Sequence, residues 1–582
     1  MSDSLNGGSI NPAKPPKKEL SMEVRLLLAF LLMGAVMFLT PYIMPQAPPA
    51  KKGATSPVAA STSAQPPAKD AAATSAVPPP TPEAATEPLP ANATPQKPED
   101  HFIIETDLYR IRLSNQGGNV RSWQLKKYKG NDNKPLDLVN SASTLDYPFS
   151  LYFAGQKPAA NVNWAWYKQT GDPDKLGVTY EFSDGHVVVR KVLRFQKNSY
   201  LSMVSTEVTL DGKPLPHLIQ WRGGFGDLTL TTAAGTQRTL YYDVTQNKLV
   251  EQAPKAGAKG AITTEGTFSF AGIADTYFAA VFLPQGTVHT QQITFEDTVS
   301  TLILKPEDKP LPLSGVAVGD GPANRFELFV GPKDVDLLRR INPKLEQVVD
   351  FGWLSVLAKP LFLIVNYVND TVVHNFGWAI VVVTVVINFI LFPLKLANMK
   401  SMRRMQALKP QVDAINAKYK GVGMRDPKAG DKNAETMELY KKHGVNPMGG
   451  CIPMMLQIPF FFAFYKVFTV SVEMRGAPWM WVTDLSQPET LPIKILPVVM
   501  IASQFIMQRM TPQPAGDPAQ QKMMMFMPLV FGFMFYNFPS GLVLYYLTSN
   551  LVSMGQQWFF NKTSMSTLAA EVIAPPKKNG RK

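Results

Sequence analysis

The sequence predicts a polytopic α-helical membrane protein with six transmembrane helices and one large antiparallel β-sandwich outside the bilayer. Apolar residues gather in one run near the start of the chain and in five runs after residue 376, and each run approaches the ~20 residues that span a bilayer. Between them, apolar and polar residues alternate with a period of two, which is typical of half-buried strands. Basic residues crowd beside the apolar runs, as on the cytoplasmic side of membrane proteins.

The composition limits the classes of function. The 582 residues are 45% hydrophobic, with a formal net charge of +13. Because this charge lies beside apolar runs, it indicates membrane orientation, and no specific nucleic-acid partner is expected. The single cysteine, Cys451, excludes an internal disulfide, so a large exported domain must be held by its own core. The six histidines are not spaced as metal ligands, so no metal site is expected.

The first hundred residues predict an anchor and a spacer. After a cytoplasmic segment 1–23, the run 24–44 is apolar apart from Arg25 at its start. It is longer than the ~7–15 residues of a signal-peptide core and lacks a clear cleavage site, which favours an uncleaved span. Residues 45–100 are rich in Pro and Ala and cannot bury enough apolar area to fold, so a disordered linker is expected.

Residues 101–340 are expected to form the β-sandwich. Runs such as 177–182 and 186–195 alternate β-branched or aromatic residues with polar ones, and glycine turns separate them. Trp221, followed by GGFGD, could mark a binding loop. An aromatic core residue beside a glycine turn is the favoured interpretation.

The rest of the chain is expected to be membrane material. Within residues 341–376, the stretch 351–375 is apolar but broken by Pro360, Asn366 and Asn369, and Trp353 and Trp378 lie near its two ends. This pattern favours an amphipathic helix lying in the membrane interface. The segments after it are the spans 377–396, 449–470, 491–510, 523–538 and 541–557, a helical hairpin 397–448, the loops 471–490 and 511–522, and a basic tail 558–582.

Charge predicts the orientation of these spans. Between residues 395 and 442 there are twelve Lys or Arg against five Asp or Glu, whereas the loop 471–490 has Arg475 as its one Lys or Arg and contains Trp479 and Trp481. By the positive-inside rule, both termini and the hairpin are cytoplasmic, and the β-domain and the loop 471–490 are periplasmic.

The span 449–470 carries more than an anchor needs. Pro453 and Pro459 remove backbone donors, and Gln457 brings an amide that lipid cannot satisfy. This composition indicates the wall of a polar cavity. Two alternative functions are less favoured. A transporter of small solutes would need inverted repeats and a charged or broken-helix site at the midplane. A membrane-tethered glycan-binding module would need an acidic and aromatic cluster on the β-domain and could dispense with the five later spans.

Other spans also supply polar groups. Thr384, Asn388 and Lys395 are spaced by four and seven, so they lie on one helical face. Asn388 alone would be read as a hydrogen-bonding contact between helices. A shared wet cavity is favoured because later spans add Gln457, Ser503, Gln504, Asn537, Tyr545 and Tyr546. Lys395 has two open alternatives: it reaches the cytoplasmic interface, or it points into the cavity.

The hairpin 397–448 combines basic and methionine side chains. Met402 and Met405 share an arm with Arg403 and Arg404, and flexible methionines suit contact with varied apolar partners. The alternative is a solvated hairpin that touches lipid headgroups. No catalytic motif is present: GxxxxGK, HExxH, CxxC and GxSxG are all missing, so neither an enzyme nor a cofactor is expected.

Longer motifs show a family resemblance. They are NFGWAI (375–380), SMRRMQALKP (401–410), LYKKHGVNPMGGCIPMMLQIPFF (439–461), FPSGLVLYY (538–546) and, in the β-region, NQGGNVRSWQL (115–125). With them the chain resembles the YidC membrane protein insertases of the Oxa type, in the Gram-negative form with a large periplasmic domain.

The resemblance implies a membrane protein insertase and chaperone of the inner membrane. In that family five core spans enclose a hydrophilic groove that is open to the cytoplasm and to lipid, and the β-domain is a supersandwich related to sugar mutarotases. Nascent membrane proteins would arrive from the ribosome, alone or with the Sec translocon, without ATP. Thr384 and Tyr546 would contact substrate and Gln457 would line the groove, while Met402, Arg403, Arg404 and Met405 of the hairpin would help to receive it.

One departure concerns charge. The family usually has an arginine at the position of Asn388, assigned to attract acidic residues of the substrate. Asn388 cannot supply charge, so the hypothesis is that Lys395 does, about 10 Å further along the same face at ~1.5 Å per residue.

Overall fold

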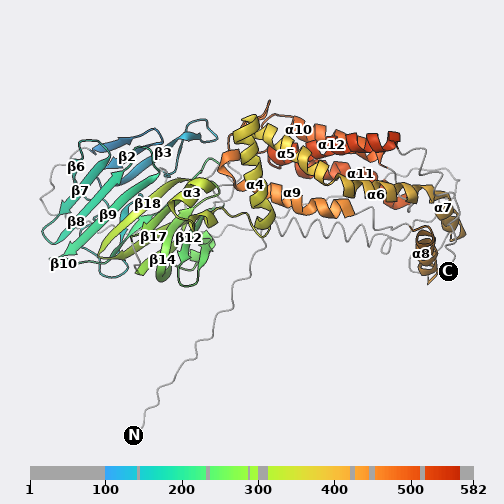
Figure 1. Cartoon of the computed structure of the whole chain (residues 1–582). Coiled ribbons are helices and arrows are strands. Elements are labelled where there is room, and N and C mark those ends of the chain that lie inside the picture. Colours follow the sequence, from blue (N-terminus) through green and yellow to red (C-terminus); the bar gives the residue numbers. More distant parts are fainter. Residues whose placement is uncertain are drawn as a thin grey trace, which may run out of the picture.

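The computed structural model describes residues 99–140, 145–230, 236–285, 289–298, 312–419, 427–444, 452–511 and 518–563. The predicted first span 24–44, nearly all of the linker 45–100, Cys451 and the tail after residue 563 lie outside these residues. Figure 1 shows the strands gathered at one end of the molecule. The long helices run away from them toward α7 (Lys409–Lys418) and α8 (Pro427–Lys442) at the other end.

The β-domain contains two antiparallel sheets. The smaller has the order β1-β2-β3-β4. The larger has fourteen strands: eleven follow the path β5-β11-β17-β16-β14-β15-β18-β9-β8-β7-β6, while β10 pairs with β9, β12 pairs with β14 and β13 pairs with β12. Its described strands are β1 (His101–Glu105), β2 (Tyr109–Ser114), β3 (Asn119–Lys129), β4 (Pro135–Asp137), β5 (Ser150–Tyr152), β6 (Lys168–Gly171), β7 (Gly177–Ser183), β8 (Val187–Phe195), β9 (Leu201–Leu210), β10 (Lys213–Pro214), β11 (His217–Trp221), β12 (Arg238–Asp243), β13 (Lys248–Gln252), β14 (Ile262–Ala274), β15 (Phe278–Pro284), β16 (His289–Thr298), β17 (Pro312–Gly321) and β18 (Ala323–Pro332).

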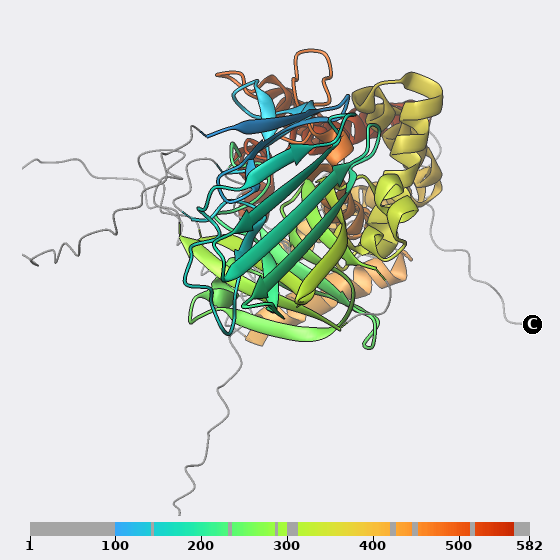
Figure 2. The same cartoon turned by 90° about the vertical axis from the view of Figure 1, so that its left-hand side faces the viewer.

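The residue pattern explains how the large sheet folds. β8 alternates buried and exposed residues, so one of its faces lies on the core, whereas β15 is buried along nearly its whole length. β14 connects the part of the sheet that contains β16 and β17 with the part that contains β15 and β18, because its first residues pair with β16 and its last residues pair with β15. Figure 2, viewed from the free end, shows this domain lying across the end of the helices.

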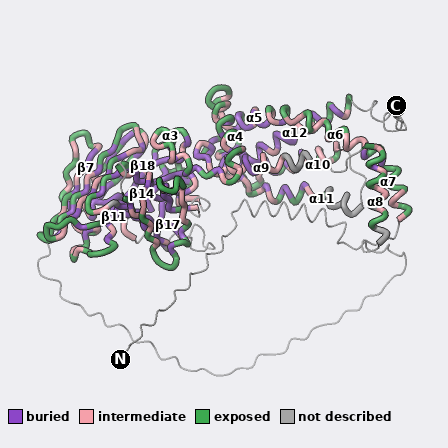
Figure 3. The backbone as a smooth tube through the Cα atoms, turned by 60° about the horizontal axis from the view of Figure 1, so that its bottom comes forward, coloured by how far each residue is buried: buried purple, intermediate pink, exposed green. Residues whose placement is uncertain are grey.

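Trp221 lies in the core, so the interpretation of a core residue beside a glycine turn is confirmed. Its side chain is fully buried, with its ring centroid 5.2 Å from that of Phe225 and 6.4 Å from those of Trp123 and Phe149. Figure 3 shows buried residues along the strands of this domain and exposed ones at its outer turns. Because the domain has no disulfide, it must be stabilised by its hydrophobic core, and aromatic rings form a large part of that core.

A buried histidine gives this domain a defined pH dependence. The ring of His217 lies 3.0 Å from the carbonyl oxygen of Leu215 through Nδ1 and 2.8 Å from the hydroxyl of Thr206 through Nε2. A carbonyl can only accept, so Nδ1 carries the proton and Nε2 accepts. Burial lowers the pKa of His217 to about 4, and the neutral ring is therefore the folded form at neutral pH.

We expect the β-domain to lose stability as the pH falls from about 6.5 to 4. The pKa of His217 is lower in the folded than in the unfolded chain, so its contribution is complete above about pH 6.5 and is lost below it, by roughly 3 kcal/mol. Urea unfolding of the full chain in detergent, followed by tryptophan fluorescence across this range, measures the loss. His217→Asn should flatten the curve, and an unchanged curve would contradict the assignment.

The helical part begins with helices that cross the end of the bundle. After α3 (Val335–Ile341) and η2 (Leu345–Val348), α4 (Ser355–Val368) continues into a short π-helix, η3 (Asn369–Val373). α4 buries residues spaced by three and four, Ala358, Leu361, Phe362 and Val365, and exposes Val356 and Tyr367. Figure 1 shows α4 lying crosswise to the long helices, and the location of this segment in the membrane interface stays a prediction.

The long helices follow, and their bounds differ from the predicted spans. They are α5 (Phe376–Ile390), α6 (Phe392–Ala407), α7 (Lys409–Lys418), α8 (Pro427–Lys442), α9 (Ile452–Val470), α10 (Ile495–Met510), α11 (Pro518–Phe535) and α12 (Ser540–Thr563). The predicted span 377–396 is two helices, α5 and α6, bent by 58°. Pro393 near the start of α6 has no amide hydrogen to continue the α5 ladder, which accounts for the break.

The predicted number of six spans is not confirmed. In the part of the chain that the structure describes, Ser355–Val373 is long and apolar enough to cross a membrane, and α5 with α6 would make a second span if the bent pair is one. The apolar stretches Gln457–Val470, Ile495–Met510 and Met525–Phe535 are shorter.

Candidate functional site: a polar cavity between four helices

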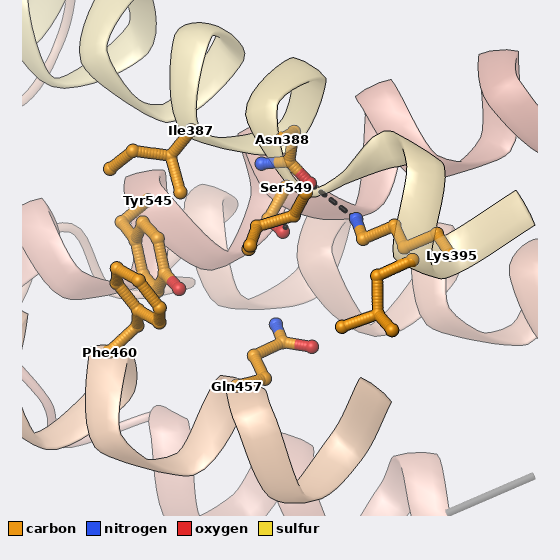
Figure 4. Close-up of a pocket in the computed structure, with 9 residues that line it drawn as sticks. Ile387, Asn388, Lys395, Gln457, Phe460, Tyr545 and Ser549 are labelled. Carbon is orange, nitrogen blue, oxygen red and sulfur yellow. Dashed lines mark hydrogen bonds between the residues drawn. The ribbon is translucent and has the colours of Figure 1, made fainter. Parts of the chain in front are cut away.

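A cavity lies where α5, α6, α9 and α12 meet. The space between its side chains is about 410 Å³ when open solvent is counted, and the part that the centres of water molecules can occupy is about 30 Å³. Its lining comprises Ile387, Asn388, Leu391, Leu394, Lys395, Gln457, Phe460, Tyr545 and Ser549. Figure 4 shows the amide of Gln457 pointing from α9 across this space toward Asn388 and Ser549.

Asn388 is the centre of a hydrogen-bond network. Its amide nitrogen donates to the carbonyl oxygen of Thr384 (2.8 Å), and its side-chain oxygen accepts from the ammonium of Lys395 (2.5 Å) and from the hydroxyl of Ser549 (3.3 Å). Gln556 of α12 donates to the backbone carbonyl of Asn388 at 3.2 Å. These bonds satisfy the polar atoms of Asn388, which explains why its buried side chain is tolerated among apolar helices.

Lys395 points into the cavity, which decides between the two alternatives left open by the sequence. Its Nζ atom lies 2.5 Å from the side-chain oxygen of Asn388 and 2.9 Å from the hydroxyl of Ser553. The break between α5 and α6 turns the start of α6 so that Lys395 comes back beside Asn388. Both acceptors are neutral, so they orient the ammonium without cancelling its charge.

The other candidate residues divide into two groups. Gln457 and Tyr545 line the cavity with Asn388 and Lys395, and Tyr545 stacks on Phe464 with ring centroids 4.3 Å apart. Thr384 is fully buried one turn before Asn388, where its hydroxyl donates to the backbone of its own helix. The structure therefore brings four of the nine predicted residues together in the lining, and Asn537 instead accepts a hydrogen bond of 3.2 Å from Lys494.

The remaining predicted residues lie elsewhere. Ser503 of α10 accepts a hydrogen bond of 3.1 Å from Asn550 of α12, forming a second polar contact between helices, and Gln504 follows Ser503 on α10. Tyr546 turns toward α11, where its ring lies 5.0 Å from that of Phe535. Adjacent residues on a helix point about 100° apart, so Tyr545 and Tyr546 could not both face one cavity.

The methionines of the hairpin are less exposed than the sequence predicted. Met405 is buried with Leu408, Val412 and Tyr440 in a small core between α6, α7 and α8. Met405 lies one turn from the α6–α7 junction, so its side chain closes the corner instead of facing a partner. Met402 and Arg404 stay half-buried on α6.

Arg403 is attached to the end of α12. Its guanidinium donates to the side-chain oxygen of Asn561 at 2.6 Å and lies 5.1 Å from the ring centroid of Phe560. α12 runs to Thr563, beyond the predicted end at residue 557, and this extension provides the contact.

One polar face of α12 was not predicted from the sequence. Ser549, Ser553 and Gln556 follow Tyr545 at spacings of four, four and three, which place all of them on one side of the helix. That periodicity was visible in the sequence and would have identified the face. In the residues that the structure describes, no group of three or more His, Cys, Asp or Glu side chains is placed to hold a metal ion.

Comparison with known proteins identifies the family. Residues 102–364 match the model of the YidC periplasmic domain, and residues 368–567 match the 60Kd inner membrane protein. The membrane protein insertase YidC of Geotalea daltonii is 33% identical over 562 residues, covering 93% of this chain and 99% of that one. The chain belongs to the YidC family of membrane protein insertases.

A second relative and one solved structure are also similar to this chain. YidC of Cupriavidus pinatubonensis is 35% identical over 484 residues, which cover 81% of this chain and 84% of that one. A crystal structure of an active YidC insertase with its first transmembrane domain resolved is 19% identical, covers 79% of this chain and 92% of that chain, and has a TM-score of 0.35. YidC proteins are inner-membrane insertases with a periplasmic domain, and here that domain is mostly antiparallel β-sheet.

Proposed function

We propose that this chain moves nascent transmembrane segments from the cytoplasm into the inner membrane through the cavity between α5, α6, α9 and α12. The observation that carries the proposal is a polar, cation-bearing cavity walled by apolar helices. A helix that only anchors the chain does not require a buried polar cavity. An insertase does, because polar residues of its substrate must cross the apolar part of the membrane.

The cavity lowers the main energetic barrier to insertion. A charged residue at the bilayer centre costs ~2.5–3.5 kcal/mol on insertion scales. Polar flanks of a substrate can stay hydrated beside Asn388, Gln457 and Ser549 while the apolar helix enters lipid. Partitioning of that helix supplies the free energy, so the proposed mechanism uses no ATP.

The proposed topology places the termini and the hairpin in the cytoplasm. The β-domain and the pair α7–α8 lie at opposite ends of the bundle (Figure 1), as this topology requires. The hairpin and the basic tail would receive substrates from the ribosome, and cooperation with the Sec translocon, contact with lipids and chaperone action in assembly belong to the same proposal. Arg403 would set the hairpin's position through its bond to Asn561 on α12.

Site-specific crosslinking tests the proposal. A photo-reactive residue at Asn388, Gln457 or Tyr545 should crosslink to a stalled nascent membrane protein, because these positions line the cavity. The matched controls are Val386 and Phe389, which lie on the same helix as Asn388 but are 51% and 62% exposed on the outer side of the bundle. Equal crosslinking from the two sets would refute the cavity as the substrate path.

A further inference from the structure

The loop between α9 and α10, residues 471–490, holds the start of α12. The amide of Ser540 donates to the carbonyl oxygen of Gln487, and the amide of Gly541 donates to that of Leu485, both at 2.8 Å. These are among the amides that a helix N-terminus leaves without an internal partner. Tyr545 of the cavity lies five residues further, about 7.5 Å along the helix.

The same loop also fixes the starts of α10 and α5. A side-chain oxygen of Glu489 accepts from the amide of Leu496 at 2.9 Å, and Asn375 donates to the carbonyl oxygen of Pro478 at 3.0 Å. The indole of Trp481 donates to the other oxygen of Glu489 at 2.7 Å. One loop therefore joins the periplasmic ends of three helices around the insertion site.

The β-domain binds the loop 471–490 through a buried ion pair. The guanidinium of Arg475 is bonded to the carboxylate of Asp227, and these side chains are 6% and 0% exposed. The guanidinium also lies 5.7 Å from the ring centroid of Tyr277 and 5.5 Å from that of Phe278. Removing one partner of such a pair leaves the other charge buried and unpaired, so the loop cannot leave without a large penalty.

The turn that carries Asp227 is shaped for this contact. Asp275 accepts the amide of Asp227 at 2.7 Å, and Asp227 in turn accepts the amide of Thr229 at 2.9 Å. Gly226 has φ +91°, and a Cβ atom there would lie 2.1 Å from the carboxylate of Asp275. The glycine turn thus brings two carboxylates close together and directs one of them out of the β-domain toward Arg475.

We propose that Asp227 and Arg475 are positioning residues that let the β-domain hold the loop 471–490, and with it the periplasmic end of α12, closed over the insertion site. Neither residue touches the cavity. They act through the hydrogen bonds from the loop to Ser540 and Gly541. Breaking the ion pair is expected to loosen these bonds while both domains stay folded.

Hydrogen–deuterium exchange of the full chain in lipid nanodiscs tests this inference. Arg475→Gln and Asp227→Asn should each speed exchange of the Leu485, Ser540 and Gly541 amides about fivefold or more, the lower end of coupling between sites. The double variant should be no faster than the faster single one, because both changes break one interaction. Unchanged exchange, or effects of the two changes that add, would overturn the proposal.

A second buried ion pair provides the control. Arg222 and Asp297, 2.6 Å apart, join elements within the β-domain. Asp297→Asn should leave the three reporter amides unchanged while it speeds exchange in β16 and β17. If Asp227→Asn unfolds the β-domain, Arg475→Gln decides the question, because Arg475 lies outside every sheet of the domain. Amide exchange is measured without a substrate. Its result therefore tests the ion pair independently of whether the crosslinking experiment supports the proposed insertion path.

Discussion

Replacing Lys395 by methionine is expected to slow insertion of substrates with acidic translocated segments about tenfold or more. The reason is that Lys395 brings a cation into the cavity and its hydrogen-bond acceptors, Asn388 and Ser553, are neutral. A hydrogen bond to a charged group contributes ~1.5–3 kcal/mol, and each 1.4 kcal/mol is about tenfold in rate. Insertion of an acidic and a neutral version of one substrate into proteoliposomes gives the measurement.

The controls separate charge from packing. Lys395→Arg should keep most activity, and Lys400→Met, on the exposed side of the same helix, should have little effect. Asn388→Ala should impair insertion less than Lys395→Met, because it releases the ammonium without removing it. If Lys395→Met is harmless and Asn388→Ala is not, the cavity works through hydration and the charge hypothesis is wrong.

Replacing Gly377 by alanine is expected to destabilise the periplasmic end of the bundle by about 1–3 kcal/mol, the cost of overpacking. A Cβ atom at Gly377 would lie 2.2 Å from the Trp479 ring and 2.5 Å from the Cβ atom of Trp479. Trp479 cannot retreat easily, because its backbone exchanges two hydrogen bonds with Val482 at 2.9 and 2.8 Å. Thermal unfolding in detergent should show the loss, with faster amide exchange in the loop 471–490.

Gly555→Ala is the matched comparison. Gly555 also lies in a long helix, but a Cβ atom there would meet open space. Alanine in a helix interior is then favoured over glycine by roughly 0.5–1 kcal/mol, so this variant should be neutral or stabilised. Equal destabilisation by the two substitutions would show that the contact between α5 and the loop does not constrain the bundle.

Local patterns in the sequence predicted the two-part architecture correctly. The period of two indicated the strands, and the cavity-lining role of Gln457 followed from an amide that lipid cannot satisfy. The boundaries were less predictable. Pro393 ended α5 earlier than hydropathy suggested, and α12 continues past its apolar part to Thr563, where Arg403 contacts Asn561.

The sequence by itself determined which segments are strands or apolar helices, and which polar residues are too costly to leave in lipid. Only the tertiary structure decided which of those residues share a cavity. It turned Lys395 back onto Asn388, separated Tyr545 from Tyr546, and joined Asp227 to Arg475 across 248 positions of chain. The physical reason is that periodicity fixes the face of a helix on which a residue lies, whereas the partner of that face depends on how distant helices and loops pack.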